Sequence, residues 1–116
     1  MKSKFGILAV IFSFVSVCSF AQAKTDTIKV WGNCEMCKGH IENAAKDAGA
    51  TTASWSEVKK LLVVSYDTTA TSNMDIQKKI AAAGYDTQDV KAEEASYKKL
   101  DKCCQYKRPE QKSSGQ

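Results

Sequence analysis

Two segments with helical spacing of apolar residues, each closed by a glycine, set the strongest limit on the fold of this chain. In the first, alanines and an isoleucine recur at helical spacing over 41–48, and Gly49 ends the pattern. In the second, a similar pattern covers 74–83, and Gly84 ends it. Ser72, with an acidic residue three positions later, resembles a capping box that starts the second segment. The sequence therefore predicts two helices of moderate length.

Segments with the residue pattern of β-strands precede and follow the predicted helices. Residues 27–31 alternate in polarity and are rich in β-branched side chains, which predicts a strand. Further strands are predicted around Trp55, over the apolar segment 61–66 and, more weakly, over 85–90. The order β-α-β-β-α-β builds a ferredoxin-like α+β sandwich with a four-stranded antiparallel sheet and two helices on one face. A short helix over 92–100 is expected to follow.

The first 23 residues have the features of a secretory signal. Two lysines precede an apolar run over 5–20, and an Ala-Gln-Ala triplet offers cleavage after Ala23. The run is shorter than about 20 residues and contains serines, which argues against a membrane anchor. Lipid attachment at Cys18 is disfavoured, because Val17 stands where such signals have a small residue. A periplasmic or secreted protein without a lipid anchor is predicted.

Charge and composition narrow the class of partner. Removal of the signal takes away two lysines and no acidic residue, so the formal net charge falls from +4 to +2. No basic patch with interleaved aromatic residues is present, and nucleic acid is therefore not predicted as a partner. The remaining residues suit one small domain and include no segment expected to insert stably in a membrane.

Four cysteines remain after the signal, in two close pairs: Cys34 with Cys37, and Cys103 with Cys104. An even number of cysteines in an exported chain first indicates disulfides. Neither local pairing would close a loop long enough to stabilise the fold much. The first pair stands in the sequence WGNCEMCKGH, between a predicted strand and a predicted helix. This placement indicates site chemistry rather than a disulfide framework.

Three chemistries compete for Cys34 and Cys37. A thioredoxin-type redox dithiol also needs a cis-proline facing it, and the only proline here is Pro109, in the tail. A zinc site needs four ligands, of which Cys103 and Cys104 could supply two if the fold brings them there. A soft ion such as Cu(I) or Hg(II) needs only two thiolates. Unpaired N–H groups at a helix start also favour the thiolate over the thiol.

The motif and the element order together resemble the heavy-metal-associated domain family. The resemblance runs over about 27–90 and includes the CxxC motif and the AAGYD turn after the second helix. The family includes copper chaperones, modules of copper-transporting ATPases and the periplasmic mercury-binding protein. The resemblance implies that Cys34 and Cys37 are the metal ligands. It also implies that Ile41 is a core residue one turn on and that Tyr85 lies beside the metal.

The chain departs from the family at Gly32, where the family usually carries a methionine under the metal loop. This departure predicts a more mobile loop and a less secure metal preference. Met36 could fill that space, face solvent or assist Cu(I) with its thioether, and the first two roles are favoured. His40, one turn beyond Cys37, could approach the metal, although an exposed histidine near a partner surface is the favoured interpretation.

The second cysteine pair has structural and functional interpretations. It could form a strained vicinal disulfide, remain as two surface thiols or tether the tail. A helix over about 92–100 would span roughly 14 Å, and the first strand spans roughly 16 Å. If that helix folds back along the sheet, Cys103 and Cys104 return to the level of the metal loop. They are therefore candidate additional ligands.

One face of the predicted sheet lacks a cover. Strand parity places Trp31, Leu61 and Val63 on the face that the two helices do not occupy. An apolar patch of this kind usually serves a partner or a lid. Tyr97 and Leu100 are the candidates for a lid, which is favoured over a docking surface.

The sequence thus predicts a signal over 1–23, a heavy-metal-associated domain over 24–91, a helical segment with the Cys-Cys pair over 92–107 and a disordered tail over 108–116. The predicted function is non-enzymatic binding of Cu(I), with Hg(II) or Zn(II) as alternatives, for buffering or transfer. A metal-transporting ATPase or another metal-handling protein is the predicted partner, by transient docking. The rival functions are thiol–disulfide exchange and a binding module that uses the Trp31 face.

Overall fold

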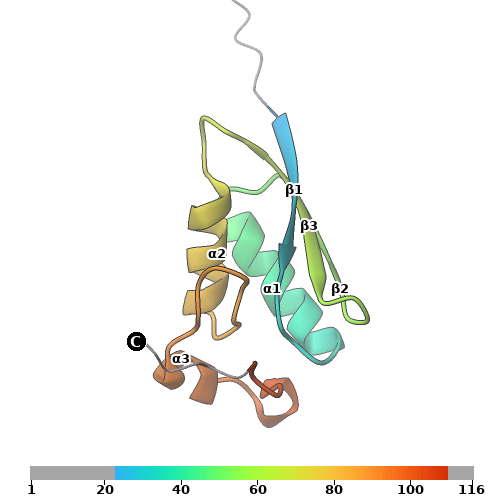
Figure 1. Ribbon diagram of the computed structural model, residues 1–116, viewed down its shortest axis with the longest axis vertical. Coiled ribbons are helices and arrows are strands. Elements are labelled where there is room, and N and C mark those ends of the chain that lie inside the picture. The colour runs from blue at the N-terminus through green and yellow to red at the C-terminus, as the bar shows by residue number, and fades with distance from the viewer. Residues whose placement is uncertain (1–22, 110–116) are drawn as a thin grey trace, which may run out of the picture.

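The computed structural model describes residues 23–109, which form an α+β fold of one small sheet with helices packed on it (Figure 1). The elements are β1 (Ala23–Lys29), α1 (Glu35–Asp47), β2 (Thr52–Ser56), β3 (Leu61–Asp67), α2 (Asn73–Ala82), the short α3 (Glu94–Lys98) and the 3-10 turn η1 (Lys102–Cys104). The sheet is antiparallel in the order β1-β3-β2. Within 23–109, no helix is both long and apolar enough to cross a membrane. The predicted signal lies outside these residues, apart from Ala23.

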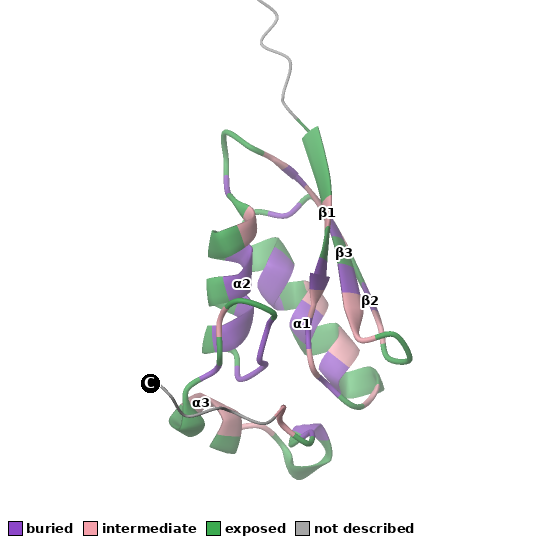
Figure 2. Ribbon diagram, viewed as in Figure 1, coloured by how far each residue is buried: buried purple, intermediate pink, exposed green. Residues whose placement is uncertain are grey.

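The core lies between the sheet and the two long helices. Alternate residues of the strands point inward and are buried, among them Ile28, Leu62 and Val64. The buried positions of the helices face them, as the purple bands on α1 and α2 show (Figure 2). Ile41 and Ile80 are completely buried. The predicted periods of two and 3.6 residues are therefore confirmed for the strands and the helices.

Local signals set the ends of the helices. The Ser72 side chain accepts a hydrogen bond of 3.0 Å from the Asp75 N–H, so the predicted cap of α2 is confirmed. Gly49 and Gly84 have φ values of +115° and +109°, in the left-handed region that favours glycine after a helix. At Gly84 a side chain would also have no space, because a Cβ atom there would lie 2.9 Å from the Ser96 carbonyl oxygen.

The predicted fourth strand over 85–90 is wrong as a continuous strand. The chain follows the edge of β1 with two backbone bonds, from Trp31 N–H to the Asp86 carbonyl and from Gln88 N–H to the Lys29 carbonyl, and with one bridge at Val30. It then turns, because the Thr87 N–H donates to the Val90 carbonyl at 2.8 Å. This turn leaves a sheet of three strands among the described residues.

Residues 92–109, which we call the extension, lie across the end of the domain that carries the β1–α1 loop (Figure 1). The predicted lid over the open sheet face is therefore wrong. Val63 keeps 44% of its surface exposed, and Tyr97 instead packs edge-on against Tyr106 with ring centroids 5.1 Å apart. The extension does not run along the open sheet face because α3 has only five residues. Leu100 also packs over Gly84 at the end of α2, which holds the extension at that end of the domain.

A buried ion pair fixes the extension to the domain. The carboxylate of Asp86 is fully buried and accepts two hydrogen bonds from Arg108, at 2.9 Å from Nε and 2.7 Å from Nη2. The Tyr106 hydroxyl accepts a bond of 2.7 Å from the Asp86 N–H and donates one of 3.0 Å to the Gly84 carbonyl. We call Asp86, Tyr106 and Arg108 the latch. The prediction that the solvated tail begins at Arg108 is thus wrong, because Arg108 is bound to the domain.

The Arg108→Gln variant should release the extension while the sheet and the long helices stay folded. Breaking a buried ion pair by removal of one partner generally costs about 3–5 kcal/mol, and the chain avoids that cost if the extension leaves Asp86 in water. Hydrogen exchange should therefore accelerate over 94–106 and stay slow in β3. Lys107→Gln, at an exposed neighbouring position, is the matched control. Slow exchange of the extension in the Arg108 variant would contradict the role of the latch.

The latch should also open in acid. Hydrogen bonds from Arg108 and from the Ala92 N–H outweigh the opposing effect of burial and hold the pKa of Asp86 below its usual value. A depressed acidic pKa contributes stability that is complete above the ordinary value of about 3.9 and is lost as the pH falls through the lower native value. We expect the Tyr97 and Tyr106 ring signals in NMR spectra to stay unchanged from pH 8 to 5 and to shift only below about pH 4. A transition near neutral pH would assign the switch to another group.

Candidate metal centre

Cys34 and Cys37 lie where β1 gives way to α1. Cys34 is the N-cap residue of α1 in an extended conformation, and Cys37 lies in the first turn with its side chain fully buried. Their sulfur atoms are 3.4 Å apart and are free thiols. The fold thus brings the two thiols together at the positive end of a helix dipole.

A third sulfur comes from the extension. Cys104 in η1 is fully buried, and its Sγ lies 4.0 Å from Sγ of Cys34. The sulfur atoms of Cys34, Cys37 and Cys104 all lie within 4.8 Å of one another, and within 23–109 these three form the one group of potential metal ligands of this size. We call them the inner cluster. With metal–sulfur bonds of about 2.3 Å, three sulfurs around one ion in a plane lie about 4.0 Å apart. The inner cluster therefore has the dimensions of a three-thiolate site.

Hydrogen bonds shape the thiols of the first pair. The Cys37 thiol donates to Oδ1 of Asn33 at 3.0 Å and accepts from the Asn33 N–H at 3.5 Å. Burial opposes ionisation of Cys34, but the N–H groups of Cys37 and Met36 outweigh it, and the pKa of Cys34 falls below its usual value. Asn33 was not predicted from the sequence. Its position directly before an N-cap cysteine was the available signal.

Cys104 has the opposite environment. Burial raises the pKa of its thiol to about 12, although a hydrogen bond with Tyr85 acts in the other direction. Burial also raises the pKa of Tyr85, so its hydroxyl keeps its proton at neutral pH. A soft ion would therefore displace a proton from Cys104 on binding, whereas Cys34 ionises more readily.

Tyr85 and His40 form a polar contact beside the cluster. The Tyr85 hydroxyl oxygen lies 2.8 Å from His40 Nδ1, and the Tyr85 ring stacks on Tyr106 with centroids 5.8 Å apart. The structure thus places Tyr85 next to the sulfurs and directs His40 to Tyr85 rather than into the inner cluster. Metal ligation by His40 stays a prediction.

Cys103 and Met36 lie on the outside of the centre. The Cys103 thiol is exposed and lies 3.7 Å from Sδ of Met36 and 4.0 Å from Sγ of Cys104. Met36 keeps 45% of its surface exposed, so it does not fill the space under the loop. These distances confirm the prediction that Cys103 and Cys104 return to the CxxC loop. Metal ligation by either residue stays a prediction.

Trp55 and Ile41 border the space where a side chain at position 32 would begin. A Cβ atom at Gly32 would lie 3.1 Å from the Trp55 ring and 3.1 Å from Ile41. The indole N–H of Trp55 donates to the Val30 carbonyl at 2.9 Å, and Lys60 Nζ donates to the Gly32 carbonyl at 2.6 Å. The Trp55 ring therefore packs against the loop. This packing gives no support to the predicted mobility of the loop.

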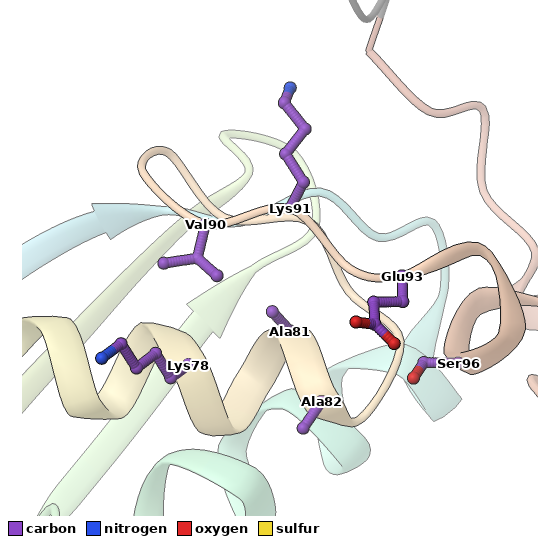
Figure 3. A pocket seen from close by; sticks show the side chains of 7 residues that line it. All are labelled: Lys78, Ala81, Ala82, Val90, Lys91, Glu93 and Ser96. Atoms are coloured by element: carbon purple, nitrogen blue, oxygen red, sulfur yellow. The ribbon is translucent and has the colours of Figure 1, made fainter. Parts of the chain in front are cut away.

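A surface hollow of about 300 Å³ lies elsewhere, between the end of α2 and the start of the extension (Figure 3). It is lined by Lys78, Ala81, Ala82, Val90, Lys91, Glu93 and Ser96. None of these side chains carries sulfur, and Lys91 points away from the hollow in Figure 3. The candidate site is therefore the sulfur cluster and not this hollow.

Comparison with solved structures places the same fold in copper-binding proteins. The CopZ metallochaperone is 26% identical, with a TM-score of 0.53 over 55% of this chain and 98% of that one. A putative copper-ion-binding protein from Bacillus anthracis str. Ames is 25% identical, with a TM-score of 0.55 over 60% of this chain and 100% of that one. The chain is structurally similar to copper-binding heavy-metal-associated domains.

A third structure extends this similarity. A copper form of a CopA variant from Bacillus subtilis is 30% identical, with a TM-score of 0.50 over 58% of this chain and 91% of that one. Comparison with protein-family models gives no match, and comparison with curated proteins gives none. The resemblance to copper-binding members of the family is supported, and the relation to the mercury-binding protein stays a prediction.

The four thiols should react with iodoacetamide in two classes when the protein is reduced and free of metal. Cys103 is exposed and Cys34 is half-buried with a lowered pKa, so both should react quickly. Cys37 and Cys104 are buried and should react slowly. Mass spectrometry of the peptides at intervals gives the order. Fast labelling of Cys104 in the intact chain would contradict its burial, whereas Arg108→Gln should produce such labelling by releasing the extension.

Proposed function

We propose that this chain is an exported protein that binds Cu(I) through Cys34 and Cys37, with Cys104 as the third thiolate. The observation that carries the proposal is the inner cluster, in which three sulfurs from two distant segments lie within 4.8 Å of one another. Soft thiolates select Cu(I) among the ions available to such a site. The similarity to copper-binding structures supports the same choice.

Zn(II) and Hg(II) are the alternative ions for the cluster. Structural zinc sites take four ligands in a closed tetrahedron, and the fourth sulfur, of Cys103, lies on the exposed side of Cys104. Hg(II) is as soft as Cu(I) and would accept the same three thiolates. The similarity to copper-binding structures ranks Cu(I) ahead of Hg(II), and the exposed position of the fourth sulfur ranks Zn(II) third.

The role of the bound ion would be buffering or transfer in the periplasm or outside the cell. Transfer would proceed by ligand exchange, in which an incoming thiolate of a partner displaces a bound sulfur. A metal-transporting ATPase or another metal-handling protein is the proposed partner, through transient docking. The protein itself would bind the ion and carry out no catalysis.

Thiol–disulfide exchange is the second candidate function, and the 3.4 Å between the sulfurs of Cys34 and Cys37 favours it. The same distance suits a shared metal ion. The environment of Cys104 separates the two candidates, since a buried third thiol with a raised pKa is a poor partner in disulfide exchange. Metal binding is therefore the better account of all three sulfurs.

The double variant Cys34→Ser and Cys37→Ser should lose tight Cu(I) binding and keep the fold. A serine hydroxyl at 37 can still donate to Asn33, so the loop keeps its main hydrogen bond. Competition with a chromophoric Cu(I) chelator measures the affinity, and far-UV circular dichroism reports the fold. Tight binding by this variant would refute the assignment of the ligands.

The single variant Cys104→Ser should lower the affinity for Cu(I) by roughly tenfold or more, a loss of at least about 1.4 kcal/mol. X-ray absorption should then report two sulfur neighbours of copper in place of three. Ser96→Ala, on the extension but away from the sulfurs, is the matched control. Three sulfur neighbours in the Cys104 variant would contradict the role of Cys104 and assign the third ligand to the outer pair, Cys103 and Met36.

Reductase activity should be poor. With insulin as the disulfide substrate and dithiothreitol as the reductant, the protein should barely accelerate the reaction over dithiothreitol alone. Turnover comparable with that of a thioredoxin would place disulfide exchange first.

A further inference from the structure

The sulfur atoms of this centre form a continuous file from the surface to the core. Neighbouring sulfurs lie 3.7 Å apart from Met36 to Cys103, 4.0 Å from Cys103 to Cys104, 4.0 Å from Cys104 to Cys34 and 3.4 Å from Cys34 to Cys37. The outer members, Cys103 and Met36, are exposed, and Cys37 at the inner end is fully buried. No step in the file exceeds the spacing of two sulfurs on one ion, about 4.6 Å for a linear site.

We propose that Cys103 and Met36 form a second, outer Cu(I) site through which copper enters and leaves the inner cluster. A thiolate and a thioether together offer the two soft ligands that a linear monovalent ion accepts. Their sulfurs would have to separate by about 0.9 Å from the present 3.7 Å to hold an ion linearly. The flexible and exposed Met36 side chain allows this movement. The inference rests on the proposed binding of Cu(I) by the inner cluster.

The arrangement of η1 explains why the outer site is separate from the inner one. Cys103 and Cys104 are adjacent in the chain, but the tight turn directs the first side chain to solvent and the second to the core. The Cys103 carbonyl oxygen also lies 3.4 Å from the Cys34 sulfur, which accounts for the close approach of η1 to the CxxC loop. The pair therefore divides its sulfurs between the two sites.

Transfer between the sites is a ligand exchange. The Cys103 thiol loses its proton to solvent as its sulfur bonds to the ion, and the bond from the ion to Cys104 breaks. The bond from the ion to the Met36 thioether then forms as the bonds to Cys34 and Cys37 break. The thiolates that the ion leaves behind then take up protons from solvent. Copper stays Cu(I) throughout, so no electron is transferred. Because Cys103 lies 4.0 Å from Cys104, its sulfur can bond to the ion before the bond to Cys104 breaks.

The variants Met36→Leu and Cys103→Ser test the outer site in the full-length protein. Protein loaded with one equivalent of Cu(I) is mixed with excess chromophoric chelator, and the rate of copper release is followed by stopped flow. Each variant should release copper roughly tenfold more slowly, as a barrier higher by about 1.4 kcal/mol predicts. Each should also lose a weaker second equivalent of Cu(I) that the unaltered protein binds. Met74→Leu, at an equally exposed methionine of α2 that is 43% accessible, is the matched control.

The outcomes distinguish this inference from the proposed function. Release at the unaltered rate in both variants, with the second equivalent retained, would overturn the outer site and leave the inner cluster intact. Loss of the first, tight equivalent in Cys103→Ser would place Cys103 in the inner cluster and also overturn the division into two sites. If the unaltered protein binds no Cu(I), both the proposed function and this inference are refuted.

Discussion

The buried carboxylate of Asp86 is the constraint on which the metal centre depends. A fully buried charge is stable only if it is paired and hydrogen-bonded, and Asp86 satisfies this need with Arg108 and the Ala92 N–H, both outside the β-α-β-β-α part of the chain. The domain is therefore complete only when the extension is in place. Cys104 lies in sequence between Ala92 and Arg108. The contacts of these two residues with Asp86 therefore also fix the position of the Cys104 sulfur.

Aromatic contacts fix the orientation of the extension on the domain. Tyr106 lies between Tyr85, on which it stacks, and Tyr97, which meets it edge-on. The Tyr97 hydroxyl donates to the Tyr106 carbonyl at 2.6 Å, and the Arg108 guanidinium lies 5.0 Å from the centre of the Tyr97 ring. Aromatic pairs add about 0.5–1.5 kcal/mol beyond the area that they bury. Tyr85 thus lies between the inner cluster and the latch, and its hydroxyl contacts His40.

The sequence predicts what local physics determines. Helix ends at Gly49 and Gly84, the Ser72 cap and the alternation of buried residues in β3 all follow from interactions within a few residues. The CxxC pair and its place at a helix start were likewise predictable, because both cysteines lie in one short segment. The return of the second cysteine pair was predicted from a helix folding back along the sheet, and the pair does return, although the extension takes another route across the end of the domain.

The predictions that failed depend on contacts between distant segments. The path of the extension is determined by Asp86 and Gly84, which meet Arg108 and Leu100 only in the folded chain. Nothing near Arg108 in sequence distinguishes it from the other charges of a polar tail. In the same way, Trp55 fills the space beside Gly32 from another strand. Neither contact produces a periodic pattern in the sequence from which it could be predicted.

The position of Cys104 on an appended segment has a consequence for how such proteins diverge. The start of α1 supplies two sulfurs by itself, and the third comes from η1, outside the sheet and the two long helices. Gain, loss or exchange of such a terminal segment would change the number of sulfurs without altering one residue of the CxxC loop. Descendants of one ancestral domain could therefore differ in coordination number while they keep identical motifs. Under the proposed function, selection could thus act on the retention of the ion separately from its capture.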